Sequence, residues 1–270
     1  MDIFQLDWIL IDSVIILLLV FLLIGVRVFK VFSRWRLSTS NREIQVKTIS
    51  LKDLDINTSK KGLRLEQCKL ISNQKDKDSE KPLIILCNSN FQPELLNALS
   101  EGLVSSGFKV LRLKLKISTS LKKIVTSNFS LEKVGQNFYS YLTVILEFLL
   151  QTKRLELSQY VIIKAGKASL PYKKLLNDPN NKGLILINPA SQALERDFSS
   201  FFHLTRQKRL LLVFTRIPYL IFKRRLLSQH LNAVSNSLSV IKGAFYSFKN
   251  YETILFGLIL KFINRKTAVF

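Results

Sequence analysis

The chain has 270 residues, 47% of them hydrophobic, which suits one large α/β domain and excludes an intrinsically disordered chain. Its two cysteines (Cys68, Cys87) and two histidines (His203, His230) match no metal-ligand spacing, so we predict no metal, no cofactor and reduced core cysteines in a cytosolic domain. The 41 Lys and Arg against 19 Asp and Glu give a formal net charge of +22, which favours anionic partners, although lysine-rich solvated faces would explain it equally well.

The N-terminal segment is predicted to be a membrane anchor. In the run of residues 8–26, only Asp12 and Ser13 are polar. As an α-helix at about 1.5 Å per residue, this run spans about 28 Å, close to the thickness of the hydrocarbon core. Acidic residues precede the run and basic residues follow it, so the positive-inside rule places the C-terminal side in the cytoplasm. We expect a single-pass membrane protein with its anchor over residues 1–36 and a cytoplasmic domain over residues 37–270.

Two alternatives to the anchor were weighed. A cleaved signal peptide needs a basic start and a small-residue cleavage site, and this sequence has neither. A buried core helix is the other alternative, although residues 13–26 form a long uncharged stretch for that role. Asp12 lies one turn inside the helix, where the membrane interface tolerates a carboxylate.

Strands and helices alternate through the rest of the chain. The first two strands alternate charged and apolar residues, as half-solvated antiparallel strands do, and the later strands are continuous apolar runs typical of strands covered on both faces. A helix that ends at Gly107 follows the third strand. The predicted strands are residues 44–51, 63–71, 83–87, 108–115, 159–164, 183–188, 209–214 and 238–241, and the predicted helices are residues 93–106, 131–150, 168–177, 219–234 and 248–264. This alternation predicts a parallel sheet with helices on both faces.

The turn after the strand at 159–164 has the layout of a nucleophile elbow without a nucleophile. In the elbow pattern G-x-S-x-G, the serine stands at the apex of a turn from a buried strand into a helix. Residues 164–168 here read Lys-Ala-Gly-Lys-Ala, which puts Gly166 at the serine position. A glycine has no side chain that could attack a substrate.

From about residue 82 to its C-terminus, the chain resembles the α/β-hydrolase superfamily. Besides the elbow, the resemblance rests on the order and spacing of residues 82–111, of Gly-Leu-Ile-Leu-Ile-Asn-Pro at 183–189 and of Ile-Lys-Gly-Ala-Phe-Tyr-Ser-Phe at 241–248. It implies an α/β-hydrolase-like, mostly parallel sheet with helices on both faces, and makes the two earlier β runs its antiparallel first strands. A Rossmann-like nucleotide binder is the rival fold, but no G-x-G-x-x-G follows the first parallel strand, and the chain has no P-loop.

The resemblance also implies that the catalytic triad has been lost. Carried over by position, the family's serine falls at Gly166 and its histidine at Tyr246. The residues that would carry the acid, 215–218, read Thr-Arg-Ile-Pro and contain no carboxylate. We therefore predict no catalytic residue at the family's positions, with Ser169 and Ser89 as fallback nucleophiles.

The same region could hold an anion. The oxyanion loop begins Asn88-Ser89 and lacks glycine, whereas the elbow still leads into a helix N-terminus whose backbone N–H groups attract anions. Lys164 and Lys167 flank Gly166, so these five residues are our candidates for binding a carboxylate or phosphate. The alternative is that Gly166 only relieves a strained turn and that both lysines are solvated.

Three functions follow as hypotheses. The first is a membrane-anchored, catalytically inactive α/β-hydrolase-like protein that binds an anionic lipid or ligand, or an acidic protein partner, at the cytoplasmic face. The second is a membrane-tethered esterase or lipase-like serine hydrolase with a displaced nucleophile. The third is a basic module that binds nucleic acid; the sequence offers only residues 207–209 and 223–225 for it, so we do not expect it. The oligomeric state is left open.

Overall fold

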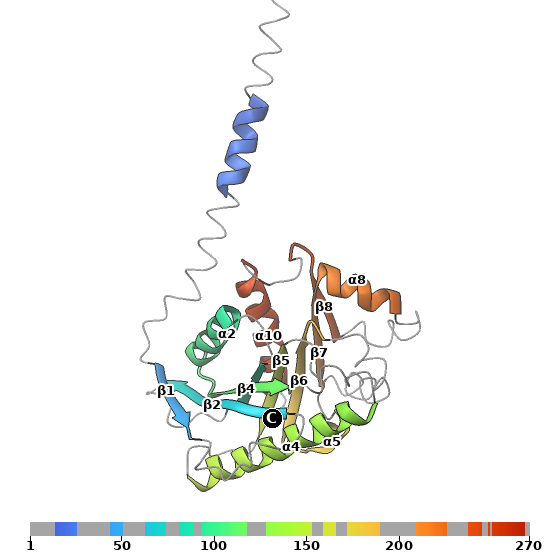
Figure 1. The fold of residues 1–270 in the computed structure, drawn as a ribbon. Helices are drawn as coiled ribbons and strands as arrows, with labels where there is room; N and C mark the ends of the chain where they lie inside the picture. The colour runs from blue at the N-terminus through green and yellow to red at the C-terminus, as the bar shows by residue number, and fades with distance from the viewer. Residues whose placement is uncertain are drawn as a thin grey trace, which may run out of the picture.

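The structure is a computed structural model and contains an eight-stranded sheet. It describes residues 14–25, 44–50, 63–73, 81–88, 93–117, 128–152, 159–165, 172–189, 209–225, 237–244, 248 and 250–267. The strand order of the sheet is β1-β2-β4-β3-β5-β6-β7-β8. The strands are β1 (Ile44–Ile49), β2 (Leu63–Asn73), β3 (Leu83–Asn88), β4 (Val110–Ile117), β5 (Tyr160–Ala165), β6 (Asn181–Ile187), β7 (Leu210–Thr215) and β8 (Leu238–Ile241) (Figure 1). β2 pairs antiparallel with β1 and β4, and the pairs from β4 through to β8 are parallel. The predicted sheet, with its two antiparallel first strands, is confirmed.

Helices cover both faces of this sheet. One face packs against α2 (Pro93–Ser105) and α10 (Glu252–Thr267), and the other against α4 (Asn128–Gln151) and α5 (Tyr172–Asn177) (Figure 1). A further helix, α8 (Arg216–Arg225), follows β7 and contacts β7 and β8. The predicted layering of helices on both sides of the sheet is therefore confirmed.

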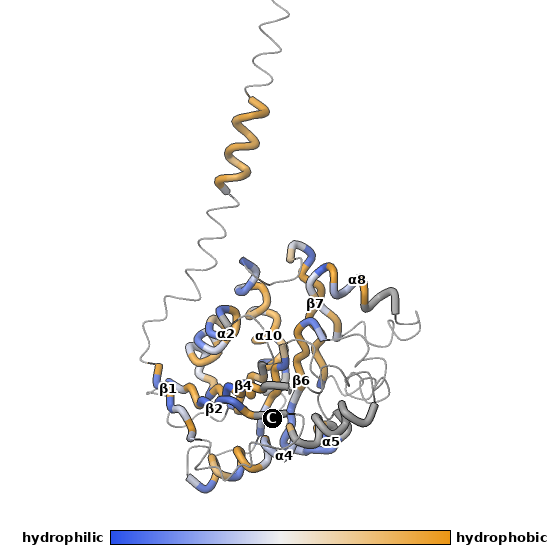
Figure 2. The backbone as a smooth tube through the Cα atoms, viewed as in Figure 1, coloured by the Kyte–Doolittle hydropathy of each residue, from blue (hydrophilic) through white to orange (hydrophobic). Residues whose placement is uncertain are grey.

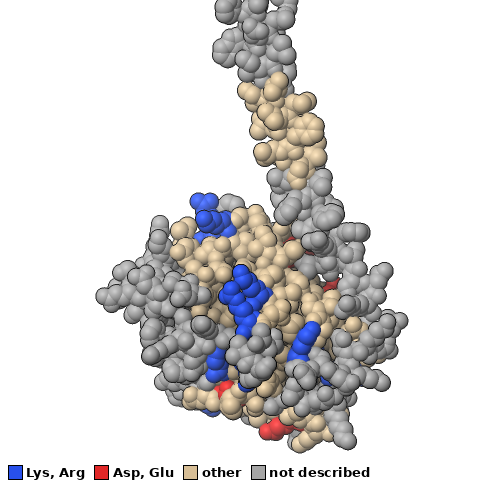
Figure 3. Space-filling view, turned by 180° about the vertical axis from the view of Figure 1, so that it is seen from behind, with Lys and Arg blue, Asp and Glu red and all other residues tan. Residues whose placement is uncertain are grey.

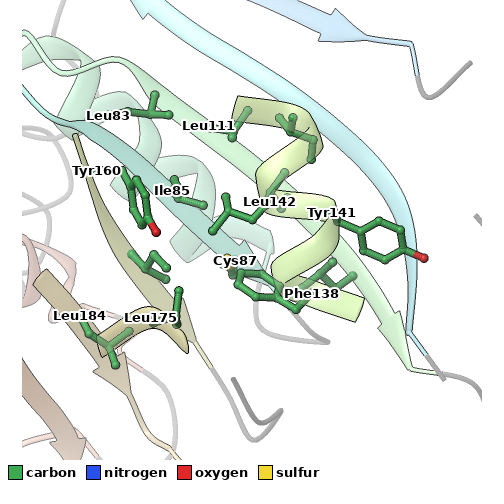
Figure 4. Close-up of a cluster of buried hydrophobic side chains, with 14 of the residues drawn as sticks. Leu83, Ile85, Cys87, Leu111, Phe138, Tyr141, Leu142, Tyr160, Leu175 and Leu184 are labelled. Carbon is green, nitrogen blue, oxygen red and sulfur yellow. The ribbon is translucent and has the colours of Figure 1, made fainter. Parts of the chain in front are cut away.

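Each face of the sheet has its own apolar core. Along β5, Ile162 belongs to the cluster on the α4 side, and Val161 and Ile163 belong to the cluster on the α2 side. Figure 4 shows the α4 side, where Phe138 of α4 lies beside Cys87 of β3. Because both faces are buried, β3 and β5 consist almost entirely of apolar residues, with Lys164 and the terminal Asn88 as the exceptions.

The predicted end of α2 at Gly107 is confirmed. Gly107 has a φ of 82°, in the left-handed region that glycine adopts without a steric penalty. Its N–H donates to the Val104 carbonyl at 2.9 Å, and the Phe108 N–H donates to the Leu103 carbonyl at 3.1 Å. These two bonds form a Schellman cap that satisfies the last carbonyls of the helix and sends the chain into β4.

Three predicted helix starts are wrong by three or four residues, and the first is α4, which begins at Asn128 rather than at Leu131. α8 begins at Arg216, directly after β7, because Pro218 fits the first turn of a helix, where its missing N–H costs nothing. α10 begins at Glu252 rather than at Phe248. Asn250 has a φ of 70°, and the Tyr251 N–H donates to the Phe248 carbonyl at 2.8 Å, so a tight turn occupies this stretch.

Residues 14–25 of the predicted anchor form a helix with an apolar surface (Figure 2). The side chains from Val14 to Ile24 are between 47% and 66% exposed. No helix among the described residues has the length and hydropathy to cross a bilayer. The remainder of the predicted span, residues 8–13 and 26, lies outside the described residues.

A polar cluster joins several elements at the amino ends of β5 and β6. One Asp178 carboxylate oxygen accepts hydrogen bonds from the hydroxyls of Tyr160, at 2.5 Å, and Tyr139, at 3.3 Å. The other accepts the Asn180 N–H at 2.9 Å, and Arg209 donates to the Asp178 carbonyl at 3.4 Å. Burial, and then the bond to Asp178, raises the pKa of the Tyr160 phenol well above its ordinary value. Asp178 therefore ties α4, β5 and the turn before β6 together.

We predict that Asp178→Ala lowers the free energy of unfolding by about 2 kcal/mol, because it leaves the buried Tyr160 hydroxyl without its acceptor. Urea denaturation measures the change. The double variant Tyr160→Phe/Asp178→Ala is expected to lose less than the sum of the two single losses. Glu147→Ala, at an exposed position of α4, is the control and should change stability by less than about 0.5 kcal/mol. Equal effects of Asp178→Ala and Glu147→Ala would contradict the role of this cluster.

Candidate functional site

The strand order changes direction between β3 and β5. The chain leaves β3 through α2 for β4 on one side, whereas β5 pairs with β3 on the other side. In open parallel sheets, ligands bind beyond the carboxyl ends of the strands at such a switch point. The register pairs Cys87 with Lys164 and Asn88 with Ala165, so the two strands end side by side. The predicted oxyanion loop and elbow therefore start from neighbouring strand ends.

Most of the predicted ligand residues lie just past these strand ends. Ser89, Gly166 and Lys167 are outside the described residues, as is Ser169, one of the two fallback nucleophiles. For Asn88 the structure gives the backbone, which closes β3. Binding of an anion by these residues stays a prediction.

Lys164 is the predicted ligand residue whose side chain the structure describes, and it is buried. Its side chain is 2% exposed, and its Nζ donates to the Ala165 carbonyl at 3.1 Å. Its register neighbours Cys87 and Leu186 both belong to the core on the α4 side. The amine thus extends into that core, which contradicts the alternative that both lysines of the elbow are solvated.

Burial changes the protonation of Lys164 and of its neighbour Cys87. Desolvation lowers the pKa of the Lys164 amine to about 8, and the adjacent thiol opposes this shift. Desolvation raises the pKa of the Cys87 thiol to about 12, with Lys164 acting in the opposite direction. Cys87 is therefore protonated at neutral pH, and a protonated buried thiol is a poor nucleophile.

The position of the family's acid is filled by neutral and basic groups. Thr215 ends β7 fully buried, and α8 starts at the next residue, Arg216, so no loop separates strand from helix. The Thr215 N–H donates to Asn188 Oδ1 at 2.8 Å, and the Asn188 N–H donates to the Val213 carbonyl at 2.9 Å. Asn188 reaches this position with a φ of 46°. It joins the ends of β6 and β7.

The turn after β8 contacts the same part of the edge. The Arg216 N–H donates to the Ala244 carbonyl at 2.9 Å, which links the start of α8 to this turn. Gly243 in the turn packs so closely on Tyr251 that an added Cβ would lie 2.0 Å from the phenol oxygen. Lys242 is exposed in the same turn. Tyr246, the predicted histidine position, lies outside the described residues.

The described part of the carboxyl edge carries neutral and basic residues. It comprises residues 88, 165, 187–189, 215–216 and 241–244, and none of these is Asp, Glu or His. Its charged members, Arg216 and Lys242, are both exposed. No group of His, Cys, Asp or Glu among the described residues could hold a metal ion. General acid–base chemistry is most often carried by His, Asp or Glu, and these described positions contain none of the three, with Lys242 as their titratable group.

Sequence reasoning missed Asn188 and the exposed Lys242. Asn188 follows an apolar strand and precedes Pro189, and an Asn-Pro pair is a turn signal that marks such a position. The Asn-Pro pair indicated a turn, but it did not indicate that Asn188 Oδ1 would accept the Thr215 N–H at the end of β7.

Comparison with known proteins supports the fold. No protein-family model matches the sequence, and no curated protein matches it. Among solved structures, a fungal esterase from Rhizomucor miehei aligns with a TM-score of 0.54 and 10% identity over 86% of this chain and 85% of that chain. An acylaminoacyl peptidase from Pyrococcus horikoshii aligns with a TM-score of 0.51 and 15% identity over 84% of this chain and 42% of that chain. The chain has the α/β-hydrolase fold, as the sequence resemblance implied.

We predict that Lys164→Met stabilises the protein by roughly 3 kcal/mol at pH 7 and by much less at pH 10. The pKa of about 8 lies below the ordinary 10.5, so the folded state disfavours the charged amine; the penalty is complete below pH 8 and disappears as pH approaches 10.5. Cys68 and Cys87, with pKa values raised from 9.0 to about 12, act oppositely above pH 9. Both cysteines are present in the variant and in the parent, so most of their contribution cancels in the difference between the two unfolding free energies. Urea unfolding at both pH values gives this difference, and an equal difference at both would show that the amine stays charged.

Proposed function

We propose that this chain is a membrane-anchored, catalytically inactive α/β-hydrolase-like protein that binds an anionic ligand at the cytoplasmic membrane face. The observation that carries the proposal is the carboxyl edge of the sheet, where Thr215 and Arg216 occupy the acid position. The ligand class includes an anionic lipid headgroup and an acidic segment of a protein partner.

The loss of catalysis is supported at three positions of the fold. Serine-hydrolase chemistry needs a nucleophile, a base that deprotonates it and an acid that orients the base. The nucleophile position is Gly166, and no histidine follows β8, because the chain has only His203 and His230. β7 runs directly into α8 at Arg216 and leaves no carboxylate there. One missing group could be replaced by a neighbour, whereas the loss of all three groups favours an inactive protein.

Anion binding is supported by the charge at the same edge. Carboxyl ends of parallel strands share one edge of a sheet, so Arg216 and Lys242 lie at the same edge as Ala165, the residue that precedes Gly166 and Lys167 in the sequence. Arg216 is the first residue of the ten-residue helix α8. Its positive charge therefore adds to that of the backbone N–H groups at the start of the helix. Opposed charges that would neutralise them are missing from the described residues of this edge.

The membrane anchor is supported by the exposed apolar helix at residues 14–25 and by the sequence on either side of it. A water-exposed helix with eleven consecutive large apolar side chains, Val14 to Ile24, costs free energy unless a lipid or protein surface covers it. The basic residues that follow favour the cytoplasmic side for the domain.

We predict that inorganic phosphate binds the full-length protein and that Arg216→Gln or Lys242→Gln weakens binding about tenfold or more, as expected for a charge-assisted hydrogen bond. The increase of Tm with phosphate concentration, followed at constant ionic strength, gives the dissociation constant. Lys109→Gln removes a positive charge beside the amino end of β4 and should leave the constant unchanged. A dissociation constant that rises equally in all three variants would indicate only the general positive field, and absence of phosphate binding would contradict the proposed site.

A further inference from the structure

The three strands β1, β2 and β4 form an antiparallel wing whose two faces differ in chemistry. One face is apolar and packs on the α4 side through Ile49, Leu65, Cys68, Leu70, Leu111, Leu113 and Leu115. Figure 2 shows hydrophilic stretches along β2 and β4 beside the hydrophobic central strands. Because side chains alternate along a strand, the residues between these apolar positions belong to the opposite face.

On that opposite face, Ile71 and Val110 are buried in the core beneath α2, and we call the remaining residues Val46, Thr48, Lys69, Arg112 and Lys114 the basic face. The register pairs Thr48 with Lys69 and Lys69 with Arg112, which sets these residues in one row across the three strands. Lys114 is 57% exposed at its side chain, and Val46 is 54% exposed. The basic face is thus open to solvent at Val46 on β1 and at Lys114 on β4, whereas Lys69 and Arg112 are half-buried.

Like charges face each other across this face. Lys69 and Arg112 are direct partners in the antiparallel ladder, and Arg64 and Lys116 are Cα partners further along it. Opposed like charges on neighbouring strands destabilise a sheet. Glu66 forms an ion pair with Lys114 at 3.1 Å, and Arg112 donates a hydrogen bond to Asn97 of α2. These contacts leave Lys69, Arg112 and Lys114 with a net positive charge that an external anion would offset.

We propose that the basic face docks on the anionic surface of the bilayer that holds the anchor. This inference rests on the proposed membrane anchoring. β1, the edge strand of the basic face, is the first strand after the anchor, and residues 26–43 separate it from the helix at 14–25. That segment carries five basic residues, Arg27, Lys30, Arg34, Arg36 and Arg42, against one acidic residue, Glu43. The anchor, the connecting segment and the basic face therefore favour the same negatively charged surface.

A lipid surface fits this face better than a protein partner does. The central part of a protein interface is usually apolar and depleted in lysine, whereas four of the five residues of the basic face are polar and three of them are basic. Anionic headgroups present many mobile charges and do not require shape complementarity. On the face that Figure 3 shows, which is the far side of the view in Figure 1, blue Lys and Arg cover more of the described surface than red Asp and Glu do. The test must therefore separate this face from the general field.

The experiment uses the full-length protein in vesicles whose headgroups carry a fluorescence quencher. Val46→Cys puts a thiol-reactive fluorophore on the basic face, and Glu147→Cys puts it on the exposed side of α4, across the sheet. The native Cys68 and Cys87 are fully buried and do not compete for the label. Vesicles contain phosphatidylcholine alone or with phosphatidylserine.

We predict quenching at position 46 that requires phosphatidylserine, disappears in high salt and falls severalfold in the Lys69→Gln/Lys114→Gln background. Position 147 should show little quenching in either vesicle. Equal quenching at both positions, or quenching at position 46 that does not depend on phosphatidylserine, would overturn the proposal that the basic face docks on the membrane. If an alkaline wash removes the protein from the vesicles, the anchor and the proposed function fail. If the protein stays in the vesicles and position 46 remains bright, only the docking inference fails.

Discussion

The burial of β3 and β5 on both faces is the constraint on which the rest of this structure depends. Their side chains alternate between two apolar cores, one beneath α2 and α10 and the other beneath α4 and α5. A strand buried in this way must pair on both edges, which brings the carboxyl ends of β3 and β5 together at Asn88 and Ala165. The fold therefore builds the setting of a hydrolase site whether or not catalytic groups occupy it.

The charges at this edge differ from those of a hydrolase in a consistent direction. Arg216 follows β7, Lys242 follows β8, and the amine of Lys164 extends into the core on the α4 side. A buried lysine costs free energy. An enzyme whose elbow must hold a nucleophile within a fraction of an ångström has little tolerance for a charged group under it. This pattern supports the proposed binding of an anion.

Much of the fold could be predicted from the sequence, because its signals are local. The burial of β3 and β5 could be predicted from their own apolar runs, and the end of α2 could be predicted from its capping glycine. The side-chain environment of Lys164 could not be predicted, since a lysine inside an apolar strand gives no sign of which neighbours will bury it. The start of α8 was missed because Pro218 is compatible with either a loop or the first turn of a helix. The role of Asn188 needed the register between β6 and β7.

Reaction of the full-length folded protein with a fluorophosphonate probe tests the central claim, the loss of serine-hydrolase chemistry, most directly. The probe labels a serine that a base has activated, and a competent esterase of the same fold serves as the positive control. The account predicts no labelling above that of the heat-denatured protein. Stoichiometric labelling that Ser169→Ala or Ser89→Ala abolishes would contradict it and would establish a displaced nucleophile.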